Sequence, residues 1–127
     1  MSDTTTRGIR IQVEPEYRAD QSDPDRDHYL FAYRIRISNV GDQTATLRSR
    51  HWVITNANGH TEEVRGPGVV GEEPELAPGE AFEYVSYCPL NTPVGTMHGS
   101  YGMEADSGEH YDAKISVFRL AVPGLLN

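Results

Sequence analysis

Apolar and polar residues alternate along most of this chain with a period of two. In the longest stripe, residues 29–37, every second residue is apolar, while Arg34 and Arg36 occupy the other phase. Because successive side chains of a strand point to opposite faces, the pattern predicts strands with one buried face. We expect about eight or nine strands and no amphipathic helix. The other alternating segments lie at 9–13, 45–47, 52–54, 82–84, 97–103 and 111–117.

Turn-forming residues separate these segments. Asn58-Gly59 lies between two alternating stretches, and both residue types tolerate the positive φ of a two-residue hairpin turn. Pro78-Gly79 and Ser107-Gly108 predict further turns, because proline fixes φ and glycine accepts positive φ. Many short strands with such turns indicate a sandwich or a barrel, and we favour an all-β antiparallel sandwich.

The length of 127 residues fits one domain, so residues 1–127 are assigned to a single unit. Residues 1–6 are expected to be disordered, and the polar residues 20–27 to form a mobile loop. Pro15 and Pro89 predict strands at the periphery of their sheets, because proline cannot donate to a ladder. The side chains expected to be mostly buried between the sheets are Phe31, Ile35, Trp52, Tyr84 and Ile115.

Charge and cysteine content narrow the class of protein. Eleven Lys and Arg against nineteen Asp and Glu give a formal net charge of −8, which disfavours nucleic acid as a partner. No apolar run is long enough for a membrane span, and the N-terminus does not resemble a secretory signal. The single cysteine, Cys88, excludes an internal disulfide and suits a reducing compartment. We expect a cytoplasmic protein that binds neither nucleic acid nor a membrane.

Arginine supplies almost all of the positive charge, and several arginines are close in sequence. Arg34, Arg36, Arg48 and Arg50 lie on or beside predicted strands. The simpler interpretation is that they pair with neighbouring carboxylates on strand surfaces. The alternative is recognition of a carboxylate or phosphate, for which the planar guanidinium is suited.

Residues 66–71 read Gly-Pro-Gly-Val-Val-Gly and fit the G-x-G-x-x-G pattern of dinucleotide-binding loops. That pattern works where glycines let the backbone approach a pyrophosphate at a helix N-terminus. Here Glu72, Glu73 and Pro74 follow, and no helix is predicted. We favour a glycine-built bend or bulge between two strands, and phosphate binding stays open as the alternative.

No catalytic or metal-binding pattern stands out. Residues 23–27, Asp-Pro-Asp-Arg-Asp, copy the start of an EF-hand loop, but His28 and Arg34 replace the required glycine and glutamate. A loose divalent-cation site at this loop is kept as an alternative. Neither Cys88 nor Ser86 lies in a context typical of a nucleophile. We expect no catalytic residue, no metal site and no cofactor. The histidines, none at short zinc-ligand spacing, are His28, His51, His60, His98 and His110.

The stretch from His51 to Tyr101 combines many spaced residues that form a specific signature. It contains His51-Trp52, the glycine-rich residues 64–71, residues 74–86 with Pro78-Gly79-Glu80, and residues 90–101 with Thr92-Pro93. This stretch resembles the ApaG family, and the flanking strands extend the resemblance over nearly the whole chain. One departure is Tyr87, where the family usually has glycine.

The resemblance implies an immunoglobulin-like or fibronectin type III-like β-sandwich without enzymatic activity. It also implies protein contacts, as in related eukaryotic domains, and an association with cobalt resistance and magnesium efflux. The glycine-rich motif of the family suggests pyrophosphate binding.

Our functional hypothesis is a non-enzymatic module that binds a protein, whose identity the sequence does not give, with an edge strand near residues 66–75 as the recognition surface. A homodimer through an edge strand is a further option. The alternative is a weak binder of nucleotide, pyrophosphate or a divalent cation. The candidate binding residues are Gly66, Gly68, Val69, Val70, Gly71 and Glu72.

Overall fold

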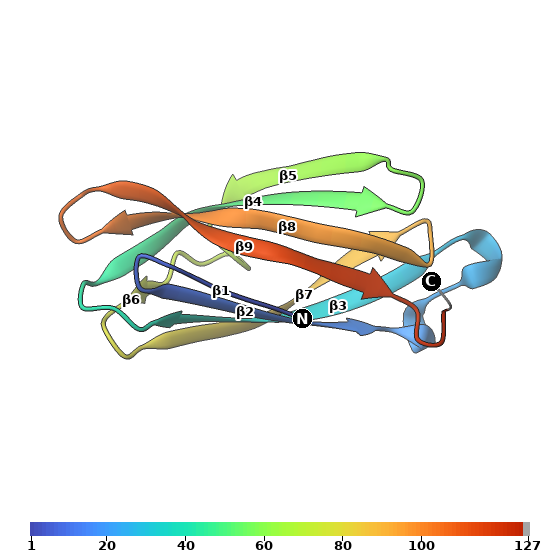
Figure 1. Cartoon of the computed structure of the whole chain (residues 1–127), viewed down its shortest axis with the longest axis horizontal. Coiled ribbons are helices and arrows are strands. Elements are labelled where there is room, and N and C mark those ends of the chain that lie inside the picture. Colours follow the sequence, from blue (N-terminus) through green and yellow to red (C-terminus); the bar gives the residue numbers. More distant parts are fainter. Residues whose placement is uncertain (126–127) are drawn as a thin grey trace.

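The computed structural model describes residues 1–125, which form nine strands in two packed sheets (Figure 1). The strands account for most of the chain, as the period of two predicts, and the all-β sandwich is confirmed. The strands are β1 (Ser2–Thr6), β2 (Ile9–Tyr17), β3 (Tyr29–Asn39), β4 (Ala45–Asn56), β5 (Thr61–Pro67), β6 (Glu75–Leu76), β7 (Ala81–Leu90), β8 (Val94–Ala105) and β9 (His110–Ala121). Two one-turn 3₁₀ helices, η1 (Ala19–Gln21) and η2 (Pro24–Arg26), occupy the predicted loop between β2 and β3.

All strand pairs are antiparallel. Sheet I has the order β1-β2-β3-β7, and sheet II has the order β5-β4-β8-β9, with β6 also paired to β4. The inner faces of the sheets form one hydrophobic core. Of the five side chains predicted to be buried, Phe31, Ile35, Trp52 and Ile115 are buried, whereas Tyr84 is only partly buried.

The predicted disorder of residues 1–6 is wrong, because residues 2–6 form β1. This strand pairs with β2 through a two-residue turn at Arg7-Gly8, where both residues have positive φ. The Arg7 guanidinium is held by Glu109 at 2.8 Å and lies over the Tyr111 ring. These contacts stabilise a hairpin turn that lacks the usual asparagine or aspartate.

Strand β4 is continuous, whereas the sequence predicts two short strands there. The pairing with β8 shifts by one residue between Leu47 and Ser49, so Arg48 is the extra residue of a β-bulge. A second bulge lies where His98 of β8 faces both Ser116 and Val117 of β9. It turns Val117 outward, although the alternation in sequence places this residue in the buried stripe.

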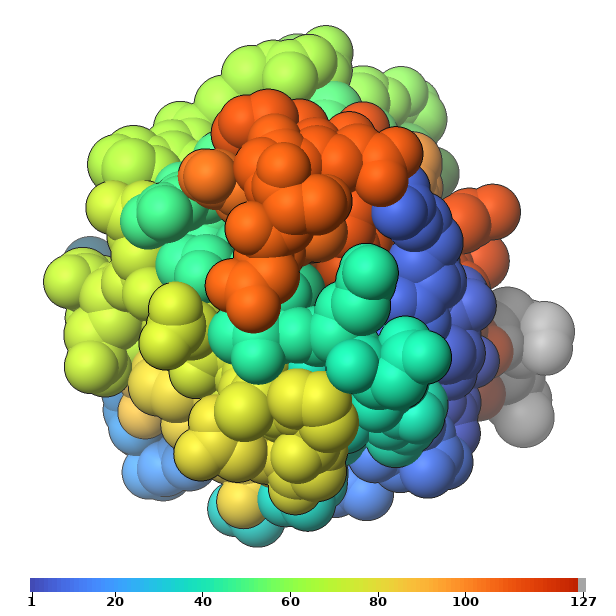
Figure 2. Space-filling view, turned by 90° about the vertical axis from the view of Figure 1, so that its left-hand side faces the viewer, coloured from blue at the N-terminus to red at the C-terminus, as the bar shows by residue number. Residues whose placement is uncertain are grey.

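The two long sides of the sandwich differ. On one side β1 packs beside β9, and the Thr4 hydroxyl hydrogen-bonds the Ser116 hydroxyl. Figure 2 views the sandwich from one end, where the blue N-terminal hairpin lies next to the orange β8–β9 hairpin. On the opposite side β5 and β7 are edge strands without a further partner among residues 1–125. We call this the open side. Pro89 lies on edge strand β7, as predicted. The prediction is wrong for Pro15, because its strand β2 lies between β1 and β3; the proline is accommodated there because the pairing with β1 reaches only as far as Val13.

Candidate functional site: the inter-sheet pocket

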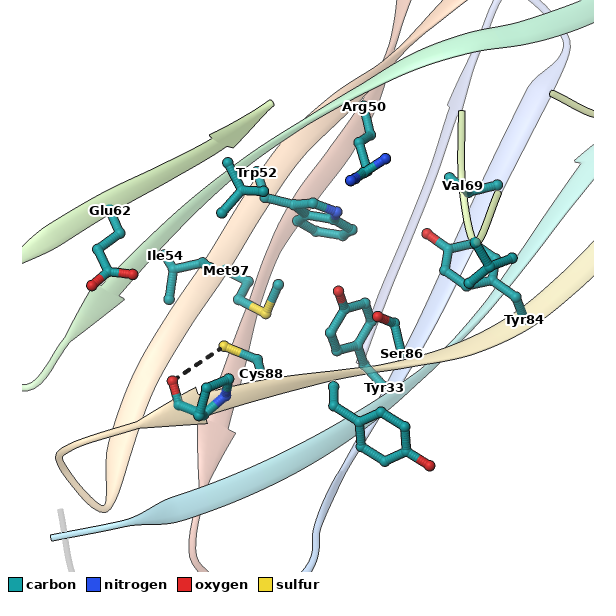
Figure 3. A pocket seen from close by; sticks show the side chains of 14 residues that line it. Tyr33, Arg50, Trp52, Ile54, Glu62, Val69, Tyr84, Ser86, Cys88 and Met97 are labelled. Atoms are coloured by element: carbon teal, nitrogen blue, oxygen red, sulfur yellow. Dashed lines mark hydrogen bonds between the residues drawn. The ribbon is translucent and has the colours of Figure 1, made fainter. Parts of the chain in front are cut away.

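A pocket of about 390 Å³ opens between the two sheets on the open side (Figure 3). Side chains from both sheets line it, and Val69 and Val70 of the β5–β6 connection close one end. We call it the inter-sheet pocket. Its lining residues are Tyr33, Arg50, Trp52, Ile54, Glu62, Val64, Val69, Val70, Tyr84, Ser86, Tyr87, Cys88, Pro89 and Met97.

The bulge in β4 determines which side chains reach the pocket. Leu47 points into the core, and without the extra residue Arg48 the next inward positions would be odd-numbered. The bulge shifts the phase, so Arg50, Trp52 and Ile54 line the pocket on consecutive inward positions. A positively charged side chain therefore lies on the inner side of sheet II, in phase with Trp52 and Ile54.

Arg50 is the principal polar group at this end of the pocket. Its Nη1 donates to the carbonyl oxygens of Pro67 at 2.8 Å and Gly68 at 3.1 Å. Unlike Arg36 and Arg48, which form the predicted surface ion pairs, Arg50 pairs with no carboxylate within residues 1–125. Its positive charge and remaining donors are therefore available to a bound group.

The hydroxyl and thiol groups of the pocket remain protonated near neutral pH. Burial raises the pKa of Tyr33 and of Tyr84, whose hydroxyl is hydrogen-bonded to that of the buried Tyr101. Burial also raises the pKa of the Cys88 thiol to about 12. Tyr33 and Ser86 thus present neutral hydroxyls, which can donate hydrogen bonds to an anionic group.

The pocket continues along the open side into a second hollow of about 380 Å³. Ile54, Glu62 and Pro89 line both hollows, and His60 and Asn91 line the far one. Together the two hollows form a groove that follows β5 and β7, with positive charge from Arg50 at one end and negative charge from Glu62 in the middle.

The glycine-rich segment forms a bend, as the favoured interpretation predicts. The backbone N–H groups of Gly68, Val69 and Glu72 donate to the carbonyls of Arg48, Glu72 and Val69. These three donors are therefore not free to hold a phosphate. A Cβ on Gly66 would lie 2.8 Å from an Arg50 nitrogen, so this glycine makes room for the guanidinium.

The two valines of the segment have opposite environments. Val69 is 1% exposed and packs in the core, whereas Val70 is 55% exposed beside the pocket. Val70 also has a φ of 44°, a conformation that is strongly disfavoured for a β-branched residue. Of the predicted binding residues, Val69 and Val70 line the pocket and Gly66 supports Arg50, while Gly71 and Glu72 lie outside the lining.

The strained backbone at Val70 leads to a stability prediction. We expect Val70→Asn to raise the free energy of unfolding by about 1 kcal/mol, because asparagine adopts the left-handed conformation at lower cost. Val70→Ala keeps most of the strain and serves as the control, with a change within about 0.5 kcal/mol. Urea unfolding followed by Trp52 fluorescence measures both, and a destabilised Val70→Asn would contradict the prediction.

Other polar groups remain apart from the pocket. His51 Nε2 donates a 2.7 Å hydrogen bond to the Glu63 carboxylate on the outer face of sheet II. Within residues 1–125 no three His, Cys, Asp or Glu side chains gather as a metal site would require. No helix in this part of the chain has the length and apolar character needed to cross a membrane.

Comparison with known proteins gives consistent matches over most of the chain. A family model described as the ApaG domain matches residues 19–105. A protein named ApaG from Shewanella baltica (strain OS155) is 56% identical over 119 residues, 94% of each chain. A protein of the same name from Azoarcus sp. (strain BH72) is 54% identical over the full length of both chains. A crystal structure described as the ApaA protein of Bordetella pertussis has a TM-score of 0.91 at 46% identity and covers 96% of this chain and 99% of its own.

Proposed function

The chain belongs to the ApaG domain family, and we propose that it is a non-enzymatic module that binds a protein partner along the open side of its sandwich. The observation that carries the proposal is the inter-sheet pocket, which is lined by both sheets and opens between two edge strands. A cytoplasmic location is part of the proposal, because a buried free thiol at Cys88 suits a reducing compartment.

Besides the pocket, the edge strands of the open side can also contact a partner. The outer edges of β5 and β7 carry backbone N–H and C=O groups that an extended segment of another chain can pair with. The exposed valines Val64, Val70 and Val85 and the exposed Tyr87 lie on or beside these edges. Apolar side chains flanking a pocket and free backbone groups are the features that strand addition uses.

The proposal of a non-enzymatic role rests on the state of the reactive groups. Cys88 is buried, and its raised pKa keeps it in the thiol form, which is a poor nucleophile. Among the residues that the structure describes, no histidine lines the inter-sheet pocket, so Ser86 has no neighbouring imidazole as general base there. Binding of pyrophosphate at residues 66–71 is disfavoured by the engaged amides and by the glutamates that follow.

Photo-crosslinking tests whether the open side contacts a partner. We expect p-benzoylphenylalanine at Tyr87, which is 52% exposed at the pocket rim, to crosslink a specific protein in native cells. The same group at Val117, which is 60% exposed on β9, is the matched control and should capture none of it. Mass spectrometry identifies the captured protein.

A second variant links the crosslink to the β5–β6 connection. The double substitution Val70→Asp, Glu72→Arg changes exposed positions only, unlike any change at the buried Val69. We expect it to reduce the Tyr87 crosslink about tenfold while the protein still unfolds cooperatively, since central contacts of an interface often contribute above 1 kcal/mol. Equal capture from both crosslinker positions, or an unchanged crosslink in the double variant, would contradict the proposal.

A further inference from the structure

The charges of the inter-sheet pocket limit the group that can occupy it. Arg50 and Glu62 are the charged side chains among its lining residues, so one positive charge faces the end closed by Val69 and Val70. A singly charged anion balances this guanidinium, whereas a pyrophosphate carries more negative charge than one cation balances. Arginine donates through a planar fork that matches a carboxylate. Charge complementarity therefore favours a carboxylate.

The hydroxyl groups beside Arg50 extend this arrangement. Figure 3 shows the guanidinium of Arg50 and the hydroxyls of Tyr33 and Ser86 facing the same space, with the Trp52 indole beside them. The two hydroxyls come from sheet I and the arginine from sheet II, so a carboxylate in this space receives donors from both sheets. Such convergent polar groups in an otherwise apolar pocket are typical of ligand sites.

The remaining walls determine what is attached to the carboxylate. Trp52, Ile54 and Met97 form an apolar surface next to the polar end. A volume of about 390 Å³ is at the lower end of the range for ligand pockets, about 300–1,000 Å³, and suits one or two residues. The exposed and strained Val70 adds an apolar contact at the end of the pocket near Arg50, at a position where glycine or asparagine would be less strained.

We propose that the inter-sheet pocket binds the free C-terminus of a partner polypeptide, with its carboxylate on Arg50 and its last, large apolar side chain against Trp52. The residues before this C-terminus lie in the groove and pair with an open edge strand, β5 or β7. This inference deepens the proposed function and rests on it, since it names the part of the partner that the open side receives.

The first test compares an acid with its amide. Trp52 is the only tryptophan of the chain, so its indole N–H gives one signal in a ¹⁵N-correlation spectrum. We expect N-acetyl-L-phenylalanine to shift this signal saturably and N-acetyl-L-phenylalaninamide to bind about tenfold or more weakly, because the amide loses the charge-assisted bonds. Equal binding of acid and amide, or no saturable shift by the acid up to ~10 mM, would overturn the inference.

The second test separates a polypeptide from a small carboxylic acid. The tetrapeptide N-acetyl-Thr-Val-Thr-Phe with a free C-terminus should bind about tenfold more tightly than N-acetyl-L-phenylalanine, because its backbone can pair with an edge strand. If the tetrapeptide shows no gain in affinity, the pocket is assigned to a small carboxylic acid, and the proposal that it binds a polypeptide is overturned.

Matched variants locate the binding without disturbing Arg50, which also holds the carbonyls of Pro67 and Gly68. Val64→Glu places a carboxylate on the pocket wall and should weaken binding of the acid about tenfold by repulsion. Val117→Glu adds the same charge on β9 and should leave binding unchanged. Equal effects of the two variants would overturn the assignment. If the Tyr87 crosslink persists while acid and amide bind equally, the inference fails and the proposed module stands.

Discussion

Replacing Trp52 by alanine should lower the free energy of unfolding by roughly 3–5 kcal/mol, because it removes a large buried side chain and leaves a cavity. The indole is 3% exposed and packs edge-to-face against Tyr33, Tyr101 and Phe118, with ring centroids 5.5, 6.2 and 6.0 Å away. These rings join β3 of sheet I to the strands of sheet II. Denaturant unfolding followed by circular dichroism measures the loss, and in thermal unfolding the same loss lowers the midpoint by roughly 10–20 °C.

Trp52→Phe is the control for this substitution. Phenylalanine keeps an aromatic ring between the sheets, so we expect a loss well below that of the alanine variant. Val117→Ala changes an exposed side chain on β9 and should leave stability within about 0.5 kcal/mol. A loss below about 1.5 kcal/mol for Trp52→Ala would show that the core relaxes around the missing indole.

The general fold follows from local signals that act over a few residues. The period of two predicts the strands, and the hairpin turn includes Asn58-Gly59 as the sequence predicts. It is not a two-residue turn, because the connection spans residues 57–60 and Gly59, at a φ of 82°, has positive φ whereas Asn58 does not. Pro78 and Gly79 form the predicted turn, closed by a 2.9 Å bond from the Glu80 N–H to the Ala77 carbonyl. Local signals do not predict the turn at Arg7-Gly8, because its stability comes from Glu109 and Tyr111, which are distant in sequence.

The candidate site was harder to predict because it depends on a bulge. The apolar positions change from odd numbers at Ala45 and Leu47 to even numbers at Trp52 and Ile54. This change predicts two strands, but one inserted residue in a continuous strand produces the same pattern. That second interpretation places Arg50 on the inner face and would have distinguished it from the surface arginines Arg36 and Arg48. A change of phase within an apolar stripe is therefore a usable signal for an inward-facing charge.

Within the glycine-rich segment, Gly68 matters more for the structure beside the pocket than the other glycines do. Gly68 has a φ of 57°, and a Cβ on it would lie 2.2 Å from the backbone oxygen of Glu72. Gly71 also has positive φ, at 81°, but a Cβ there meets nothing within 4 Å. The first glycine is needed for both conformation and space, and the second for conformation alone.

We therefore expect Gly68→Ala to lower the free energy of unfolding by about 3 kcal/mol or more, combining left-handed strain with displacement of the turn. Gly71→Ala is the matched control and should cost about 1–2 kcal/mol, since it adds strain only. Because the Gly68 carbonyl accepts from Arg50, the first substitution should also shift the Trp52 indole signal and weaken binding of N-acetyl-L-phenylalanine. Thermal unfolding and the same spectrum measure both effects. Equal losses for the two variants would mean that the turn at residues 69–72 moves freely, and that the bend does not position Arg50.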